Sequence, residues 1–231
     1  MNFRRFLTRE ELDQAVAHLL LSEIRTPLAG PYAFLLAGGR TPLAAYRRCA
    51  DALRQRQRAE PPPSAGLRLT FTDERMVPDD APESNYGSAR PLIAALGLPA
   101  ESVLRAATAL PLPAAAQHWH DDLAAFLACG GILTLGLLGL GMDGHTASLF
   151  SRDDLARGRG RWVIPVLRED GPNRVSVTPD LLTRVQRLVF VAAGPDKADV
   201  VERLFRAPET LIAGSAVAAA PRVEVWFSPA A

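Results

Sequence analysis

Residues 132–150 read ILTLGLLGLGMDGHTASLF, and this stretch decides the fold. Its apolar run ends at Leu138 and predicts a buried strand. Three glycines follow within six residues and predict a turn, after which we expect a short helix from about His145. The turn brings Asp143 and His145 to the tip of the strand, where residues without side chains let a ligand approach the backbone closely. This turn is therefore the first candidate for a functional site.

The rest of the chain alternates apolar runs with segments of helical spacing. Thr8 and Glu11 form a capping-box pattern before a helix that is expected to end near Arg25. Further apolar runs predict strands at residues 32–36, 67–71, 162–167, 175–177, 188–192 and 223–227. Strands that alternate with helices favour an α/β fold, a mostly parallel, doubly wound sheet with helices on both faces. We assign residues 1–231 to a single domain.

Polar turns follow several of the predicted strands. They lie at residues 38–41, 73–75, 139–145 and 194–197. Ligands of doubly wound sheets bind beyond the carboxyl ends of the strands. We therefore expect the fold to bring these turns to one rim, although they are far apart in the sequence.

The sequence GGRTP at residues 38–42 has the composition of an anion-binding loop. Its glycines free the backbone amides, and the start of a helix adds the positive end of a dipole. The alternative is a tight turn in which Thr41 caps the helix and Pro42 is the first helical residue. Arg174 and Lys197, the only lysine of the chain, supply further positive charge and favour the phosphate interpretation.

Asp143 and His145 allow two interpretations. Taken alone, the aspartate is a helix cap and the histidine packs beneath it. The run GLGMDG also spells GxGxxG, but no acidic residue stands ~20 positions further on and Asp143 would repel a pyrophosphate, so we reject a dinucleotide cofactor. The histidines form no metal-binding set, and no G-x-S-x-G elbow supplies a covalent nucleophile. A histidine general base that acts on water remains.

Composition excludes several classes of partner. The formal net charge is +1, so nothing points to nucleic acid or to a membrane surface. Cys49 and Cys129 lack a framework spacing and suit a reducing interior, and no apolar run reaches the ~20 residues that span a bilayer. We therefore expect a cytoplasmic protein.

Arg75, in the DER turn, is either ion-paired at the surface or a binding residue.

Several segments resemble the 6-phosphogluconolactonase family in order and spacing. They are AGGRTP (37–42), FTDERMVPDDAPESNYGSAR (71–90), LLGLGMDGHTASLF (137–150), PNRVSVT (172–178) and VAAGPDKADVV (191–201). The resemblance covers nearly the whole chain and implies a Rossmann-like α/β fold. It also implies hydrolysis of 6-phospho-D-glucono-1,5-lactone to 6-phospho-D-gluconate in the oxidative pentose phosphate pathway, without a cofactor or metal. Ala37 departs from the serine that often opens the glycine loop of the family.

Carried over residue by residue, the resemblance implies roles. His145 is the catalytic base that activates water without a covalent intermediate, and Asp143 stands beside it as its catalytic partner. The turn around Arg75 lines the sugar, whereas the glycine loop, Arg174 and Lys197 hold the phosphate. The implied substrate-binding residues are Gly38, Gly39, Thr41, Asp73, Arg75, Asn85, Gly144, Arg174 and Lys197. The expected partner is a small sugar phosphate, bound by a monomer or a weak homodimer.

The related glucosamine-6-phosphate deaminases are the runner-up. Their motif carries a glutamate five residues after the histidine, where this chain has Phe150, which cannot transfer a proton. A sugar-phosphate sensor without activity would keep the cationic residues but need no base, so the pair of Asp143 and His145 argues against it. The sequence leaves open the oligomeric state, the preference between 1,5- and 1,4-lactones, and whether Asp143 orients His145 or contacts the substrate.

Overall fold

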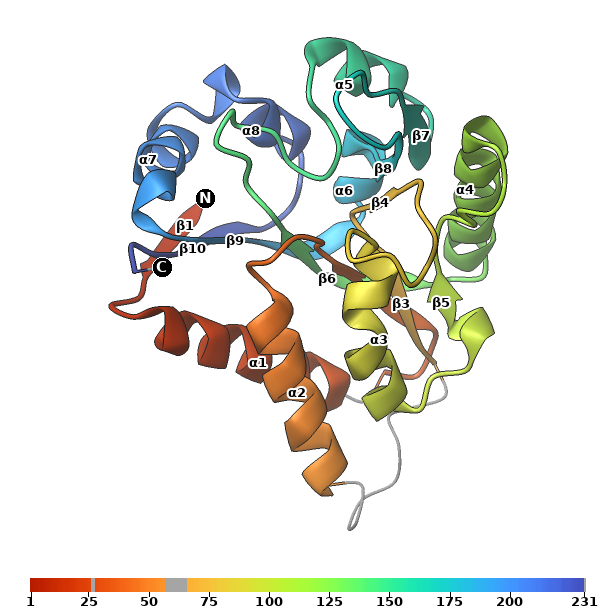
Figure 1. The fold of residues 1–231 in the computed structure, drawn as a ribbon, viewed down its shortest axis with the longest axis horizontal. Coiled ribbons are helices and arrows are strands. Elements are labelled where there is room, and N and C mark those ends of the chain that lie inside the picture. Colours follow the sequence, from red (N-terminus) through yellow and green to blue (C-terminus); the bar gives the residue numbers. More distant parts are fainter. Residues whose placement is uncertain (26–27, 57–65, 231) are drawn as a thin grey trace.

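A seven-stranded sheet forms the centre of the computed structural model, which describes residues 1–25, 28–56 and 66–230 (Figure 1). Its strand order is β1-β10-β9-β6-β2-β3-β5, and neighbouring strands are parallel throughout. The strands are β1 Asn2–Arg5, β2 Tyr32–Leu36, β3 Leu67–Phe71, β5 Val103–Leu104, β6 Ile132–Leu138, β9 Val185–Ala193 and β10 Val223–Ser228. Parallel pairing places all their carboxyl ends at the same edge of the sheet.

Helices cover both faces of this sheet. Figure 1 shows α1, α2 and α3 on one face and α7 and α8 on the other, which confirms the doubly wound α/β prediction. The longer helices are α1 Arg9–Arg25, α2 Leu43–Arg56, α3 Asn85–Leu96, α4 Leu112–Ala128 and α7 Ala198–Arg206. The short ones are α5 Arg152–Arg157, α6 Pro179–Leu182, α8 Ile212–Ala216, and the 3₁₀ turns η1 Ala100–Ser102, η2 Pro195–Lys197 and η3 Pro208–Thr210. Within the described residues, no helix is both long and apolar enough to span a bilayer.

A second, smaller sheet is antiparallel and was not predicted from the sequence. Its order is β4-β8-β7, with β4 Asp73–Arg75, β7 Val163–Val166 and β8 Arg174–Val177. Residues 73–75 were expected to form a polar turn, and this prediction is wrong because they pair with β8 as a strand. The chain leaves the first sheet at Thr72, whose N–H still bonds the Leu36 carbonyl at 3.0 Å and whose own carbonyl accepts the Val177 N–H at 2.9 Å.

Two local predictions need correction. The helix expected from about His145 does not form, because residues 145–150 make a loop that is closed by a bridge between Thr146 and Leu149. The next helix, α5, begins only at Arg152, after a capping box that Ser151 and Asp154 form. The polar segment at residues 54–66 was expected to be a solvated loop, but its first three residues are the last three of α2. Residues 57–65 lie outside the described part of the chain.

The helix starts are otherwise close to their predicted positions. Glu11 N–H donates to Thr8 Oγ1 at 3.1 Å and Thr8 N–H donates to Glu11 Oε2 at 3.3 Å, so the predicted capping box of α1 is confirmed. The first hydrogen bond of α2 runs from Tyr46 N–H to the Pro42 carbonyl, which makes Pro42 the N-cap in place of Thr41. The Thr41 side chain is therefore not needed to begin the helix.

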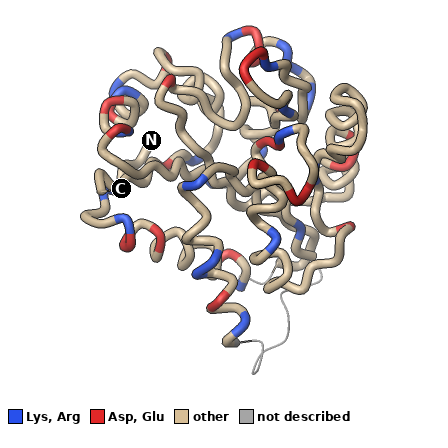
Figure 2. Tube along the Cα trace, viewed as in Figure 1, with Lys and Arg blue, Asp and Glu red and all other residues tan. Residues whose placement is uncertain are grey.

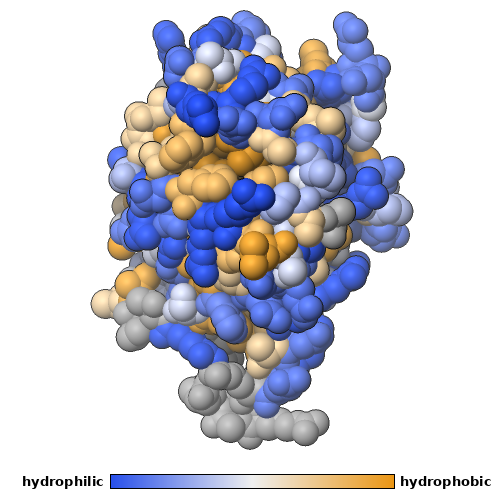
Figure 3. All heavy atoms as spheres, turned by 90° about the vertical axis from the view of Figure 1, so that its left-hand side faces the viewer, coloured by the Kyte–Doolittle hydropathy of each residue, from blue (hydrophilic) through white to orange (hydrophobic). Residues whose placement is uncertain are grey.

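Strand β1 forms one outer edge of the seven-stranded sheet. Its side chains are exposed, and the rings of Phe3 and Phe205 lie 5.6 Å apart on the surface. Figure 3 views the molecule from the side where β1 and α7 lie and shows apolar side chains among hydrophilic ones. Figure 2 shows acidic and basic residues interspersed along the chain. The monomer or weak homodimer stays a prediction.

Glu224 holds an ion cluster near the amino-terminal ends of β9 and β10. Arg187 donates from Nε and Nη2 to its two carboxylate oxygens, at 2.8 and 3.1 Å, and Arg222 and Trp226 also donate to it. Burial alone would raise the pKa of Glu224, but the hydrogen bonds from Arg187 and Trp226 and the charges of both arginines outweigh burial and lower it.

We expect Glu224→Gln to lower the free energy of unfolding by about 2–3 kcal/mol at pH 7, because Arg187 loses its buried counter-ion. Urea unfolding measures the difference. Since the pKa of Glu224 is lower in the folded than in the unfolded chain, its contribution is present above roughly pH 4 and disappears as the pH falls further. Glu202→Gln is the matched control, because the Glu202–Arg206 pair is exposed. Equal losses for both variants would contradict the prediction.

Candidate active site

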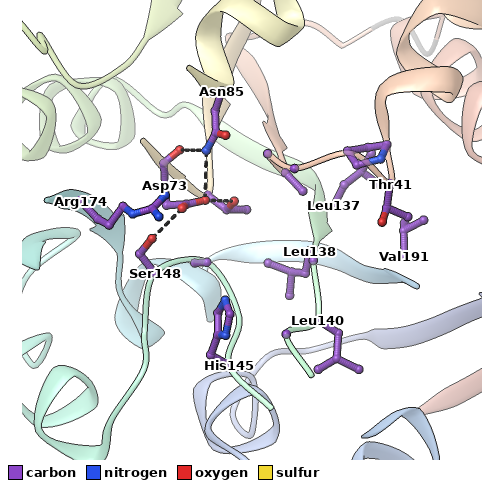
Figure 4. A pocket seen from close by; sticks show the side chains of 18 of the residues that line it. Thr41, Asp73, Asn85, Leu137, Leu138, Leu140, His145, Ser148, Arg174 and Val191 are labelled. Atoms are coloured by element: carbon purple, nitrogen blue, oxygen red, sulfur yellow. Dashed lines mark hydrogen bonds between the residues drawn. The ribbon is translucent and has the colours of Figure 1, made fainter. Parts of the chain in front are cut away.

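A cavity of about 390 Å³ opens at the carboxyl ends of the central strands (Figure 4). Residues of all the predicted polar turns line it, as the topology argument required. The predicted site residues among its lining are Gly38, Gly39, Thr41, Asp73, Arg75, Asn85, His145, Arg174 and Lys197. In the view of Figure 4, Arg174 and Thr41 lie on opposite sides and His145 lies between them.

Gly144 and Asp143 do not line the cavity. Gly144 has φ +86°, and a Cβ there would meet Leu211 Cδ2 at 2.6 Å. Its carbonyl accepts the Ala213 N–H at 2.8 Å, which ties the turn to the start of α8. The position requires glycine for backbone conformation and packing. Gly144 therefore packs against Leu211 and is absent from the lining of the cavity, and its substrate contact stays a prediction.

His145 and Asp143 form a hydrogen-bonded pair. His145 Nδ1 lies 2.5 Å from Asp143 Oδ1, and the His145 N–H also donates to that oxygen at 3.2 Å. The imidazole is 28% exposed and the carboxylate 62% exposed. Burial opposes ionisation of Asp143, but the hydrogen bond and charge of His145 outweigh it and lower the pKa of Asp143. An ionised partner at Nδ1 keeps the proton there and leaves Nε2 as the acceptor. The helix-cap interpretation of Asp143 is therefore wrong.

Gly141 makes room for this pair. A Cβ at residue 141 would overlap His145 Nδ1 and Asp143 Oδ1. The Gly141 N–H also donates to the His145 carbonyl at 2.9 Å, so backbone and side chains of the turn fit together only without a side chain at this position.

We expect Gly141→Ala to lower kcat of any reaction that uses His145 by about 10²-fold, because the methyl group displaces the imidazole by about an ångström. The matched control is Gly139→Ala on the same turn, where a Cβ would have no heavy atom within 4 Å and the loss should be much smaller. Steady-state kinetics and circular dichroism separate loss of activity from loss of fold. Equal losses for the two variants would mean that the clash with the pair is not the cause.

Arg75 and Arg174 form a cationic pair. They are opposite each other in the β4–β8 ladder, and the Nε of each is buried without a hydrogen-bond partner among the described residues. Burial lowers the pKa of Arg174, the positive charge of Arg75 lowers it further, and Asp73 offsets part of this. Arg75 Nη1 donates to the Glu83 carbonyl at 2.9 Å. The surface ion pair considered for Arg75 is not what the structure shows, and the two Nε atoms without a hydrogen-bond partner favour an anionic ligand.

Asp73 is buried in the wall of the cavity. Its carboxylate accepts hydrogen bonds from Ser148 Oγ at 2.6 Å and Thr72 Oγ1 at 3.0 Å. Asn85 Nδ2 donates to the Asp73 carbonyl at 2.8 Å, and Figure 4 shows these bonds together. A Cβ at Gly38 would overlap the Asn85 amide, so the glycine loop also packs against this network. Asp73 thus connects the loop of His145 with β4 and α3.

Glu74 fixes the residues on either side of it. It is 1% exposed, and its carboxylate accepts the backbone N–H groups of Arg75, Asn85 and Tyr86 at 2.7–2.8 Å. Burial raises the pKa of Glu74 even though these three N–H groups lower it. The carboxylate therefore holds β4 to the start of α3, and Glu74 is not part of the cavity lining.

Lys197 reaches across the cavity rim. Its Nζ donates to the Leu140 carbonyl at 2.8 Å, which joins η2 to the turn after β6. The side chain lines the cavity together with the glycine loop at residues 38–42. Its predicted contact with phosphate stays a prediction.

Several residues that line the cavity were not predicted from the sequence, and Ser148, Phe150 and Arg168 are among them. Ser148 lies three residues after His145 in the same motif, and its spacing was the signal that could have found it. Arg168 comes from the loop between β7 and β8, and no sequence pattern around it predicts a site. Within the described residues, no group of three or more His, Cys, Asp or Glu side chains is arranged to hold a metal ion.

Comparison with known proteins gives one family. The family model described as glucosamine-6-phosphate isomerases/6-phosphogluconolactonase matches residues 7–225. A 6-phosphogluconolactonase of Rattus norvegicus is 33% identical over 230 residues, which cover 96% of this chain and 88% of the rat protein. A 6-phosphogluconolactonase of Haemophilus influenzae is 29% identical over 90% of this chain and 87% of its own.

Solved structures share the fold. A 6-phosphogluconolactonase of Thermotoga maritima superposes with a TM-score of 0.81 over 98% of this chain and 99% of its own, at 22% identity. A monomeric glucosamine-6-phosphate deaminase superposes with a TM-score of 0.74 at 19% identity, over 99% and 97% of the two chains. At such identities the superpositions support the Rossmann-like architecture and leave the reaction to be argued from the site.

Proposed function

The chain belongs to the family of glucosamine-6-phosphate isomerases and 6-phosphogluconolactonases, and from that premise we propose that it hydrolyses 6-phospho-D-glucono-1,5-lactone to 6-phospho-D-gluconate. The reaction is a step of the oxidative pentose phosphate pathway. One observation carries the proposal: the same cavity is lined by a histidine that is hydrogen-bonded to Asp143 and by two arginines whose buried Nε atoms lack a hydrogen-bond partner among the described residues. The first suits attack by water on an ester, and the second suits a phosphate.

The proposed chemistry uses His145 as a general base. Its Nε2 removes a proton from a water molecule while the water oxygen bonds to C1 of the lactone. The tetrahedral oxyanion then collapses, the bond between C1 and the ring oxygen breaks, and the imidazolium returns its proton to that ring oxygen. No covalent enzyme intermediate forms. Asp143 holds the imidazole in the required tautomer and balances its charge in the transition state.

The proposed phosphate site combines the arginine pair with the opposite rim. Arg174 and Arg75 offer buried Nε donors, while Lys197 and the amides of the glycine loop at residues 38–42 offer further donors near the start of α2. The resemblance implied a sugar contact for Arg75, but in this proposal Arg75 binds the phosphate, because it stands opposite Arg174 in the β4–β8 ladder. Asn85 and Thr41 remain the proposed contacts for sugar hydroxyls.

The deaminase reaction is the second candidate because that activity occurs in the same family. It needs proton transfers along the sugar. The ring of Phe150 packs against the ring of His145, with centroids 4.5 Å apart, and the Phe150 side chain has no titratable group. This contact favours the lactonase reaction.

A timed assay distinguishes the two reactions. Freshly prepared 6-phosphoglucono-1,5-lactone and glucosamine 6-phosphate are given separately to the same preparation, and acid release and ammonia release are followed. We expect lactone hydrolysis well above the spontaneous background and no ammonia. Ammonia release without accelerated lactone hydrolysis would replace the proposed function by the deaminase.

A further inference from the structure

A third arginine, Arg168, lines the cavity beside the proposed base. Its guanidinium carbon lies 4.0 Å from the centroid of the Phe150 ring, and that ring lies 4.5 Å from the ring of His145. The Arg168 side chain is 25% exposed, and its charge acts on Arg174. Arg168 therefore lines the same cavity as His145 and the cationic pair, and it is joined to His145 through the Phe150 ring.

Contacts within its own loop hold Arg168 in this position. Its N–H donates to Asn173 Oδ1 at 3.0 Å, and its Nη2 donates to the carboxylate of Asp170. The stack on Phe150 restrains the guanidinium plane. A cation that is fixed before the ligand arrives loses little freedom on binding.

Asp170 makes Arg168 different from the cationic pair. Arg75 and Arg174 form no ion pair with a described residue, whereas the charge of Arg168 is partly compensated by Asp170. A phosphate dianion is fully charged before the reaction and suits arginines whose guanidinium groups are not engaged in an ion pair. The carbonyl oxygen at C1 is neutral in the lactone and becomes charged only when water has added, so it suits a fixed, partly compensated cation beside the base.

Resting on the proposed function, we propose that Arg168 binds the oxygen atoms at C1, the reacting end of the substrate. In the forward step the electron pair of the C1 carbonyl moves onto its oxygen as the water oxygen bonds to C1, and that oxygen faces Arg168. When the ring bond to C1 breaks, the same group becomes a carboxylic acid, which releases its remaining proton to solvent and leaves the carboxylate of the product. Arg168 thus contacts the oxyanion first and the product carboxylate afterwards.

The test compares two ligands that differ at C1. 6-Phosphogluconate has a carboxylate there, whereas glucitol 6-phosphate has the same chain and phosphate with an alcohol. We expect Arg168→Gln to weaken binding of 6-phosphogluconate by about tenfold or more in titration calorimetry and to change binding of glucitol 6-phosphate by less than about twofold. In lactone hydrolysis Arg168→Gln should lower kcat and leave KM nearly unchanged. Arg168→Lys should recover part of the lost kcat and part of the lost affinity for 6-phosphogluconate.

Two further variants calibrate the comparison. Arg174→Gln should weaken the binding of both ligands. Arg159→Gln changes an exposed arginine outside the lining of the cavity and should weaken the binding of neither. Equal weakening of both ligands by Arg168→Gln would assign Arg168 to the phosphate and overturn the proposal. Unchanged binding of both would show that Arg168 only packs on Phe150 and would also overturn it. Calorimetry needs no turnover, so a failure of the lactonase assay on the unmodified chain is a separate result.

Discussion

Replacing His145 with asparagine is expected to lower kcat for 6-phosphoglucono-1,5-lactone by at least about 10²-fold, the effect of losing a positioned general base. The physical reason is that His145 is the titratable side chain whose ring faces the cavity and whose other nitrogen is held by a carboxylate. Asparagine fills a similar space but cannot remove a proton from water. KM should change little, because phosphate contacts are left in place. Initial rates must be corrected for spontaneous hydrolysis of the lactone.

Asp143→Asn is the companion variant to His145→Asn. An amide at this position can present its N–H₂ to Nδ1 and stabilise the wrong tautomer, so kcat should fall by about tenfold or more while binding of 6-phosphogluconate is kept. Asp143 lies outside the lining of the cavity, which makes it a positioning residue for His145. Turnover of His145→Asn close to that of the unmodified chain would remove the histidine from the mechanism. Weaker product binding by Asp143→Asn would instead indicate a direct substrate contact.

The central strands were predictable because parallel strands that are covered on both faces are continuous apolar runs. Tyr32–Leu36 and Leu67–Phe71 have the predicted bounds, and both are closed by polar or glycine-rich turns. Strand β1 escaped prediction because its residues, NFRR, are exposed and half of them charged, and its pairing with β10 depends on the far end of the chain. Strand β4 was not predicted because its residues, DER, are typical of a turn. Only their pairing with β8 makes them a strand.

The place of the site followed from topology, but its contacts did not. The rule for doubly wound sheets put the four turns at one rim, where the cavity lies. No local pattern could show that Arg75 stands opposite Arg174, because 98 residues lie between them in the sequence. Their pairing register is set by the small antiparallel sheet. The helix expected after His145 failed because Ala147 adopts φ +51° and breaks helical geometry.

Replacing Arg174 with methionine is expected to weaken binding of 6-phosphogluconate by about 10²-fold and binding of unphosphorylated gluconate much less. The buried Nε of Arg174 has no hydrogen-bond partner among the described residues, so an anion is the natural acceptor for it. Lys197→Met should show the same preference, with a smaller loss because its Nζ is already bonded to the Leu140 carbonyl. Both losses should shrink as salt is added, since screening weakens the ionic contact in the unmodified chain.

Stability gives this prediction a second, independent readout. The lowered pKa of Arg174 means that burial and the charge of Arg75 disfavour its charged form in the folded chain without ligand. Removing that charge should therefore leave the melting temperature unchanged or raise it, although binding is lost. Inorganic phosphate should raise the melting temperature of the unmodified chain and do so less for Arg174→Met. The contrary result would be a lower melting temperature for Arg174→Met together with equal weakening of gluconate and 6-phosphogluconate binding. It would show that Arg174 supports the fold of β8 and does not hold the phosphate, because a structural defect does not distinguish the two ligands.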